Sequence, residues 1–466
     1  MKLFDTRAGE IRDFTPIRES EVSIYVCGPT VQSAPHIGHL RSALVYDQLA
    51  RWFEYRGFKV TLVRNVTDID DKVLEKAKEA QTNWWQLAAT NQRDFSDDYL
   101  RLGIRPPAYE PLATAHIPQM IDLIQTLIER GHAYRALDGS ANVYFDTASW
   151  PQYGELTNQG IDQMESEEAT SDKKRAQDFA LWKALKENEP ASAGWSTPFG
   201  FGRPGWHIEC SAMATRYLGD HFDIHGGGLD LRFPHHENEL AQSSAAGHKF
   251  ANFWIHNGLI TTGGTKMSKS LGNSVSSQAL FELAPASAVR YYLLSAHYRS
   301  VLDYQSSVLQ EAQTALERLH GYLERCDREL SNTRFATLET AALPDEFVAE
   351  LDDDLNIPAA LAVMHELVRA GNADLDAERI REAHEKRCQL DAMLEVLGLA
   401  PSQWGSSASP EHDALDHLIR ALIEERNQAR ANKDYARADQ IRDRLAQSGI
   451  ELFDASDSTH WRLTNG

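Results

Sequence analysis

The strongest constraint on the fold lies in residues 21–64, where a strand, a helix and a second strand follow one another. The β-branched and aromatic run Val22–Val26 predicts a strand that ends at Cys27. Apolar side chains then recur at helical spacing as far as Phe53, and a second β-rich run follows Gly57. This order is typical of neighbouring parallel strands joined by a crossover helix. The sequence therefore predicts an α/β fold with a parallel sheet.

The predicted secondary structure of the rest of the chain changes several times. Residues 65–130 have a mostly helical pattern, whereas short strands and a polar stretch at 162–177 predict an insertion with a mobile loop. The apolar segments at 254–256 and 259–260 predict one further strand. Beyond about residue 285, helical spacing favours a helix bundle, and the composition of 401–410 is that of a linker before a small C-terminal unit.

The composition narrows the class of protein. The chain carries 47 Lys and Arg against 68 Asp and Glu, a net charge of −21, which argues against a general, basic nucleic-acid binder. Four scattered cysteines give no disulfide framework and fit a reducing cytosol. No apolar run approaches the roughly 20 residues of a bilayer span, and no secretory signal is visible. We therefore expect a cytoplasmic protein without a membrane partner.

The segment His36-Ile37-Gly38-His39 lies between the first strand and the helix that follows. At such a place, free backbone N–H groups and the helix dipole attract anions. Two imidazoles three residues apart can both point toward a bound phosphate, and Gly38 leaves room for a nucleotide against the backbone. An exposed loop that happens to hold two histidines is the alternative.

A second candidate for phosphate binding is Lys266-Met267-Ser268-Lys269-Ser270, which follows Gly263-Gly264 and so belongs to a flexible loop. Two lysines three residues apart suit a loop that closes on a triphosphate, because each supplies a positive charge where negative charge develops during phosphoryl or nucleotidyl transfer. A solvated basic loop is the alternative.

A third group of residues has metal-ligand chemistry. His235 and Glu239 are four residues apart in a helix-like stretch, so both side chains lie on one face. Imidazole and carboxylate groups are ordinary zinc ligands. Cys27 ends the first strand, and strand ends in a parallel sheet converge on one crevice, where Cys210 could join it. From the residues alone, buried structural cysteines and a helix-surface His/Glu pair remain open.

Two runs of acidic residues indicate local structure rather than a functional site. Asp68, Asp70 and Asp71 lack the glycine and spacing of a calcium loop and favour a helix start with acids in the first turn. The run Asp352–Asp354 predicts a solvated helix start.

The order of the two motifs, HIGH at 36–39 after the first strand and KMSKS at 266–270 well beyond the middle of the chain, resembles that of class I aminoacyl-tRNA synthetases. Nearly end to end, the chain resembles the cysteinyl-tRNA synthetase family in the segments CGPT at 27–30, TDIDDK at 67–72, DFALWK at 178–183, GRPGWHIECSAM at 202–213, HGGGLDLRFPHHENELAQS at 225–243 and KMSKSLGN at 266–273. This implies a Rossmann-like catalytic domain (1–114 and 201–230), an inserted connective domain (115–200), the rest of the catalytic domain with the KMSKS loop (231–305), a helical bundle (306–400) and a C-terminal anticodon-binding domain (411–466).

The resemblance also implies a reaction, in which ATP activates L-cysteine to cysteinyl-adenylate and the cysteine passes to tRNA(Cys). The implied catalytic residues are His36, His39, Lys266 and Lys269, and the ATP-binding residues add Gly38, Met267, Ser268 and Ser270. The implied cysteine pocket consists of Gly28, Thr67, Trp206 and His225. The implied zinc ligands are Cys27, Cys210, His235 and Glu239, with His236 beside them in the second shell or at the surface. Mg²⁺ accompanies ATP, and we expect a monomer.

Zinc has a physical reason to be there. Serine is nearly isosteric with cysteine, and a plain pocket rejects isosteres poorly, whereas zinc prefers a thiolate.

The chain departs from most relatives at Gln32-Ser33, where they carry Tyr-Asp, and at Tyr435, where many carry Trp. Tyr435 either stacks on an anticodon base or packs between helices. The rival functions are a ligase that joins cysteine to an amino-sugar and a catalytically silent zinc-holding or RNA-binding homologue.

Overall fold

A computed structural model describes residues 1–160, 170–267, 272–331, 333, 335, 341–404, 410–432, 434–454 and 459–463. The chain divides into two compact units, Met1–Ala400 and Pro401–Gly466, and each is described by itself. Among the described residues, no helix is both long enough and apolar enough to cross a bilayer.

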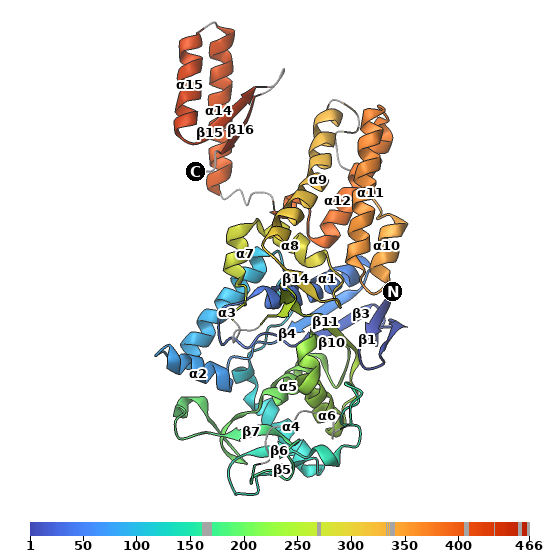
Figure 1. The fold of residues 1–466 in the computed structure, drawn as a ribbon, viewed down its shortest axis with the longest axis vertical. Coiled ribbons are helices and arrows are strands. Elements are labelled where there is room, and N and C mark those ends of the chain that lie inside the picture. Colours follow the sequence, from blue (N-terminus) through green and yellow to red (C-terminus); the bar gives the residue numbers. More distant parts are fainter. Residues whose placement is uncertain are drawn as a thin grey trace. The chain divides into compact units, whose positions relative to one another are not determined.

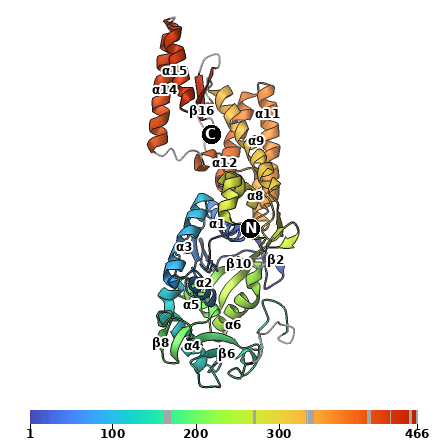
Figure 2. The same cartoon turned by 60° about the vertical axis from the view of Figure 1, so that its left-hand side comes forward.

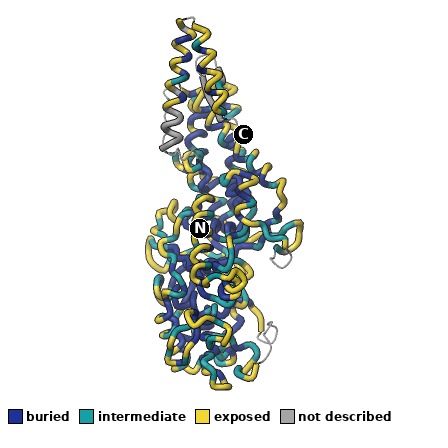
Figure 3. The backbone as a smooth tube through the Cα atoms, turned by 90° about the vertical axis from the view of Figure 1, so that its left-hand side faces the viewer, coloured by how far each residue is buried: buried dark blue, intermediate teal, exposed yellow. Residues whose placement is uncertain are grey.

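A four-stranded parallel sheet forms the centre of the first unit (Figure 1). Its strands, in spatial order, are β11 (Phe250–Asn257), β10 (His221–Gly228), β3 (Glu21–Val26) and β4 (Lys59–Arg64). Helix α1 (Ile37–Tyr55) connects β3 to β4, so the predicted β–α–β unit is confirmed. Strands β10 and β11 are buried along almost their whole length, as expected for a parallel sheet that is covered on both faces. Figure 3 shows the buried backbone concentrated in the interior of this unit.

The predicted strand over 254–260 is wrong, because β11 ends at Asn257 and a separate strand, β12 (Ile260–Thr262), begins in another sheet. The chain leaves the central sheet at Gly258, where an added Cβ would lie 2.2 Å from the Ser300 carbonyl oxygen. The buried Arg41 guanidinium donates to the carbonyl oxygens of Gly258 and Leu259, at 3.1 and 2.9 Å, and so fixes this departure. The small sheet is completed by β13 (Thr265–Lys266) and β14 (Leu302–Tyr304).

An antiparallel five-stranded sheet occupies one end of this unit, and the helices within residues 307–397 occupy the opposite end (Figures 1 and 2). Its strands, in spatial order, are β5 (Ala133–Arg135), β6 (Val143–Phe145), β7 (Phe179–Ala184), β9 (Gly200–Pro204) and β8 (Trp195–Thr197). Helix α4 (Ile117–Glu129) precedes this sheet and α5 (Trp206–Leu218) follows it. The predicted mobile loop at 162–177 falls partly on 162–169, outside the described residues.

The remaining elements of this unit are the hairpin β1 (Lys2–Asp5) and β2 (Glu10–Asp13), with the helices α2 (Asp71–Glu79), α3 (Trp84–Arg101), α6 (Glu237–Ala245), α7 (Ser277–Leu283), α8 (Ala286–Leu294), α9 (Ser307–Leu330), α10 (Asp345–Asp352), α11 (Ile357–Asp376) and α12 (Ile380–Leu397). Helix α2 starts as predicted, with Asp70 as its N-cap and Asp71 in its first turn.

The prediction of a solvated helix start at Asp352–Asp354 is wrong, because α10 ends at Asp352 and Asp354 is buried. The Asp354 carboxylate accepts hydrogen bonds from the Phe4 N–H and the Tyr298 hydroxyl, at 2.8 and 2.6 Å, and pairs with Arg299 at 2.7 Å. These partners are distant in sequence, so the run of acids alone carries no sign of them.

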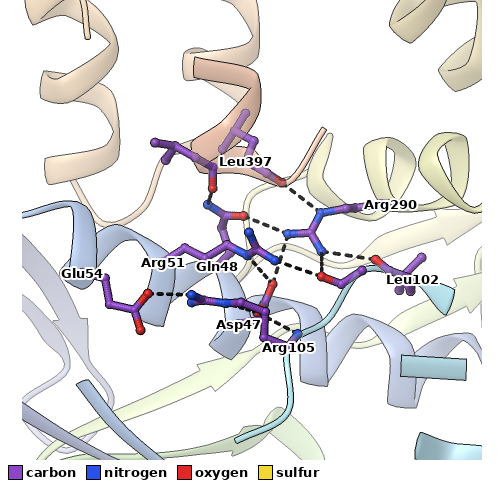
Figure 4. A network of polar contacts seen from close by, with 10 residues as sticks. Asp47, Gln48, Arg51, Glu54, Leu102, Arg105, Arg290 and Leu397 are labelled. Atoms are coloured by element: carbon purple, nitrogen blue, oxygen red, sulfur yellow. Dashed lines mark hydrogen bonds and ion pairs between the residues drawn. The ribbon is translucent and has the colours of Figure 1, made fainter. Parts of the chain in front are cut away.

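A buried polar network joins α1, α8 and the end of α12 (Figure 4). The fully buried Arg290 guanidinium pairs with Asp47 at 3.1 Å and donates to the Leu397 carbonyl oxygen at 2.9 Å. Arg51, one turn after Asp47 on α1, pairs with the same carboxylate at 2.8 Å. The helical end of the unit is thus fastened to the helix whose first residues form the His36–His39 motif.

The C-terminal unit contains α13 (Pro401–Trp404), α14 (Pro410–Ala431), α15 (Tyr435–Gln447) and a hairpin of β15 (Ile450–Asp454) and β16 (Thr459–Leu463). Its buried residues form a separate apolar cluster of Ile419, Ile423, Ile441, Leu445 and Ile450. This unit therefore has a small core of its own.

Candidate active site

The His36–His39 motif forms the first turn of α1. His36 is the N-cap, and its Nδ1 accepts a hydrogen bond from the Gly38 N–H at 3.1 Å. The His36 N–H in turn donates to His39 Nδ1 at 3.2 Å, and the two rings stack with centroids 3.6 Å apart. An added Cβ at Gly38 would lie 3.0 Å from the His36 ring, so this packing favours glycine there. The motif is thus a reciprocal cap that holds two imidazoles side by side.

This cap also decides where the imidazole protons lie. A neutral imidazole whose Nδ1 accepts a hydrogen bond carries its proton on Nε2. Both rings therefore have Nε2–H groups at the N-terminus of a 19-residue helix. Imidazole N–H groups and a helix N-terminus both favour phosphate oxygens.

The segment after the KMSKS motif is hydrogen-bonded directly to this cap. The Ile37 N–H donates to the Val275 carbonyl oxygen at 3.0 Å, and His36 forms a β-bridge with Ser276. Met267 lies on the same side, because its methyl carbon is 3.6 Å from the position that a Gly38 Cβ would take. Lys266 ends β13, whereas Ser268, Lys269 and Ser270 lie outside the described residues.

One cavity of about 340 Å³ brings together seven of the predicted site residues. Its walls include the phosphate candidates His36, Gly38, His39 and Met267, the pocket candidates Gly28 and Trp206, and the metal candidate Cys27. These residues come from the ends of β3, α1, β13 and α5, which the parallel sheet brings to one edge. Sequence segments some 240 positions apart thus surround a single space.

The four metal candidates meet behind this cavity. One ligand atom from each of Cys27, Cys210, His235 and Glu239 lies within 4.8 Å of the other three, and all four residues are buried. Glu239 Oε1 is 3.1 Å from Cys27 Sγ and 3.1 Å from His235 Nε2. The Trp206 ring stacks on the His235 ring with centroids 4.2 Å apart, so a pocket candidate lies directly against a metal candidate.

The pKa shifts in this cluster follow from its burial and from the crowding of ionisable groups. Burial, together with the neighbouring Cys210 and Glu239, raises the pKa of the Cys27 thiol well above its usual value, and burial also raises the pKa of Cys210. Burial lowers the pKa of His235, which keeps its imidazole neutral, as a metal ligand requires. Two thiols, one imidazole and one carboxylate at this spacing are a donor set that fits zinc.

A second layer of histidines surrounds Glu239. His225 Nε2 lies 2.9 Å from Glu239 Oε2, and the His225 ring stacks on Trp254 with centroids 4.4 Å apart. His236 is fully buried rather than at the surface, and its Nδ1 lies 2.8 Å from His256 Nε2. Cys27, His225, His236 and Glu239 also form a possible metal-binding group. His225 thus touches the cluster itself and does not line the cavity of about 340 Å³.

Thr67 lies behind the cavity wall and connects several site residues. Its hydroxyl donates to Glu209 Oε2 at 2.9 Å and accepts from Asn65 Nδ2 at 3.3 Å. The Gly28 N–H donates to Asn65 Oδ1 at 2.9 Å, and Cys210 Sγ lies 3.6 Å from the same oxygen. An added Cβ at Gly28 would lie 1.7 Å from the Asn65 carbonyl oxygen, so this contact requires glycine.

Sequence reasoning missed Asn65 and Glu209 in this network, and Lys72 and Asp230 in the cavity wall. A signal was present for three of them, because Lys72, Glu209 and Asp230 stand inside segments that resemble the synthetase family. Asn65 precedes TDIDDK by two positions and had no such signal. Tyr435 belongs to the C-terminal unit, where it begins α15 and its side chain is 62 % exposed.

Three family descriptions match successive parts of the chain. Residues 13–314 match "tRNA synthetases class I (C) catalytic domain", residues 346–401 match "DALR domain", and residues 412–462 match "Cysteinyl-tRNA ligase anticodon binding domain". A cysteine–tRNA ligase of Leifsonia xyli subsp. xyli is 57 % identical over 476 residues, and one of Clavibacter sepedonicus is 55 % identical over 480 residues. Each alignment covers 99 % of both chains.

Solved structures with low sequence identity share the fold. A Mycobacterium tuberculosis methionyl-tRNA synthetase in complex with methionyl-adenylate superposes with a TM-score of 0.59 at 15 % identity, covering 84 % of this chain and 93 % of that one. A LeuRS of Agrobacterium radiobacter K84 in a ternary complex with tRNA and LeuAMS gives a TM-score of 0.61 at 11 % identity, covering 85 % and 86 %. The architecture is therefore that of class I aminoacyl-tRNA synthetases.

Proposed function

The chain belongs to the cysteine–tRNA ligase family of class I aminoacyl-tRNA synthetases, and from this premise we propose which residues carry out the reaction. The reaction is the ATP-dependent attachment of cysteine to tRNA(Cys), with cysteinyl-adenylate as the intermediate. The single observation that carries the assignment of residues is the cavity of about 340 Å³, whose walls hold phosphate, cysteine-pocket and metal candidates together.

In the first step, a carboxylate oxygen of cysteine attacks the α-phosphorus of ATP and the bond to pyrophosphate breaks. No protein nucleophile is required, because positioning and charge stabilisation do the work. The Nε2–H groups of His36 and His39 donate to phosphate oxygens, and Gly38 lets the nucleotide approach the backbone. Lys266 and Lys269 hold the leaving pyrophosphate with Met267, Ser268 and Ser270 around them, and Mg²⁺ accompanies ATP.

In the second step, a hydroxyl of the terminal ribose of tRNA attacks the carbonyl carbon of the adenylate, and AMP leaves. The inserted five-stranded sheet guides the acceptor end, and the C-terminal unit binds the anticodon. Tyr435 supports this last role, because an exposed aromatic ring at a helix start can stack on a base. We infer that the enzyme acts as a monomer in the cytoplasm.

Gly28 and Trp206 line the cysteine pocket in this proposal, and Thr67 and His225 support it from outside the cavity lining. Cys27, Cys210, His235 and Glu239 would hold a zinc ion beside it, as the buried donor set supports. When bound, zinc supplies a preference for sulfur over oxygen ligands, which favours the thiolate of cysteine over the hydroxyl of serine. Trp206 supports this arrangement, since its ring lines the cavity and also stacks on His235.

The assignment is tested by comparing Cys210→Ser with Cys326→Ser, a buried cysteine on α9 that serves as the control. We expect the wild type and the control to contain one zinc per chain, to support cysteine-dependent ATP–pyrophosphate exchange that serine does not replace, and to charge tRNA(Cys). Cys210→Ser should lose the zinc and accept cysteine poorly. Exchange without charging would point to a cysteine ligase with another acceptor, and absence of both zinc and exchange would point to a silent homologue.

A further inference from the structure

A second and larger cavity, of about 770 Å³, opens beside the first. It lies between the inserted five-stranded sheet, the start of α2 and the segment before α6. Thr30, Lys72 and Trp206 line both cavities, so the two spaces meet at these three residues. A volume within roughly 300–1,000 Å³ is the usual size of a ligand pocket.

The walls of the larger cavity combine aromatic rings with lysines. The rings belong to Tyr144, Tyr153, Phe179, Trp206 and Phe233, and the lysines are Lys72, Lys173, Lys183 and Lys186. The same walls also hold Asp70, Asp71 and Asp178. This combination is typical of surfaces that bind single-stranded nucleic acid, because bases stack on rings while ammonium groups follow the phosphates.

Three of these lysines are already engaged. Lys183 and Lys186 both pair with Asp71, and the Lys173 ammonium lies 5.4 Å from the centroid of the Tyr144 ring. Lys72 differs from them, since within the described part of the chain no acid pairs with its ammonium group. The backbone of Lys72 is fixed, because its N–H donates to the Asp70 capping carboxylate at 2.6 Å. An anchored residue thus holds an unpaired, exposed positive charge at the junction of the two cavities.

The second step of the reaction brings a phosphodiester chain to this junction. The terminal ribose has to reach the adenylate in the smaller cavity, while the preceding nucleotides remain outside it. We propose that the larger cavity receives the 3′-terminal nucleotides of tRNA and that Lys72 binds a backbone phosphate there. Lys72 is then a positioning residue for the transfer step. This inference rests on the proposed function and assigns its acceptor route to named residues.

The test compares Lys72→Met with Lys78→Met, which removes the same charge from the same helix at an exposed residue that lines neither cavity. We expect ATP–pyrophosphate exchange to stay within about twofold of wild type in Lys78→Met. In Lys72→Met, which also alters the wall of the smaller cavity, exchange should fall far less than the transfer step does. Single-turnover transfer from preformed cysteinyl-adenylate to tRNA should fall roughly tenfold or more in Lys72→Met only, as expected for a lost charge-assisted hydrogen bond. Lys72→Arg should restore most of the transfer rate.

Several results would overturn the proposal. A parallel fall in exchange and transfer would mean that Lys72 serves ATP. An equal loss in Lys78→Met would mean that only overall charge matters, and unchanged transfer in Lys72→Met would mean that the phosphate passes elsewhere. Thermal melting curves of both variants should match the wild type, since both side chains are exposed. Failure of the wild-type protein to form the adenylate would instead contradict the proposed function itself.

Discussion

At the scale of single residues, Thr67 shows how a side chain outside the cavity can matter for the cysteine pocket. Its hydroxyl proton is committed to Glu209, and its oxygen also receives the Asn65 amide. Asn65 in turn holds the Gly28 N–H. The position of Gly28 at the cavity wall therefore depends on a chain of hydrogen bonds that passes through Thr67.

Replacing Thr67 by valine keeps the shape of the side chain and removes the hydroxyl. Two buried polar groups then lose a partner, which costs about 1–3 kcal/mol each, so the KM for cysteine in pyrophosphate exchange should rise roughly tenfold. The KM for ATP should change little, because the His36–His39 cap is separate. Thr67→Ser keeps the hydroxyl and serves as the control, and an unchanged KM for cysteine in Thr67→Val would exclude this role.

Lys269 is expected to act on the leaving group. Its replacement by alanine removes a positive charge from the site where pyrophosphate departs, so the rate of pyrophosphate exchange should fall about 10²–10³-fold. The KM for cysteine should remain within about twofold, since the ammonium acts on phosphate. Lys249→Ala, at an exposed position after α6, controls for the lost charge. A rate close to that of wild type would contradict the assignment.

These residue-level interactions were only partly predictable. The spacing of His235 and Glu239 placed both on one face, and the structure brings them within 3.1 Å of each other. The hydrogen bond from Thr67 to Glu209 joins positions 142 residues apart, and no local pattern encodes such a contact. The same holds for Asp354, whose partners come from β1 and from the segment before β14.

At the scale of secondary-structure elements, the network in Figure 4 fastens α8 and α12 to α1. Asp47→Asn would leave the fully buried Arg290 without its countercharge, and we expect a loss of about 3–5 kcal/mol in the free energy of unfolding, measured with urea. Glu54→Gln is the control, because its pair with Arg105 is exposed and should contribute less than about 1 kcal/mol. An equal loss of unfolding free energy in Asp47→Asn and Glu54→Gln would show that the buried network does not stabilise the protein more than an exposed ion pair does.

The pair of Asp47 and Arg290 also predicts that the free energy of unfolding depends on pH. Burial alone would raise the pKa of Asp47, but Arg290 and Arg51 outweigh burial and lower that pKa below its ordinary value. An unfolded aspartate titrates near about pH 3.9, so the contribution of Asp47 is complete above that pH and disappears as the pH falls through the folded pKa. The stabilities of wild type and Asp47→Asn should therefore converge in acid.

The elements themselves were largely foreseeable, and their exceptions have local causes. Periodicity predicts β3, α1 and β4 because one chain segment supplies both the strand and the helix that covers it. It fails at Gly258, because apolar residues continue on both sides of the point where Arg41 turns the chain away. Hydrophobicity shows that a segment is buried, whereas tertiary contacts decide which sheet it joins.

At the scale of the whole molecule, the C-terminal unit has its own apolar cluster and lies apart from the active site in sequence. A protein ending at Ala400 should therefore fold and keep cysteine-dependent pyrophosphate exchange within about twofold of the full chain. Charging of tRNA(Cys) should fall by at least about tenfold, since the loss of anticodon contacts weakens tRNA binding. Loss of exchange in the shortened protein would show that the catalytic unit depends on residues after 400.

The contact between His36 and Ser276 bears on how synthetases of this architecture can exchange parts. The histidine motif shares backbone hydrogen bonds with the segment just after the KMSKS motif, more than 200 positions away, so neither segment is an independent module. In a chimera that takes the segment from β12 to Ser276 from a distant homologue, the residues that contact the histidine cap come from a protein with a different cap. Such recombinants should succeed only when both motifs come from the same parent, which makes this pair of segments a unit of inheritance.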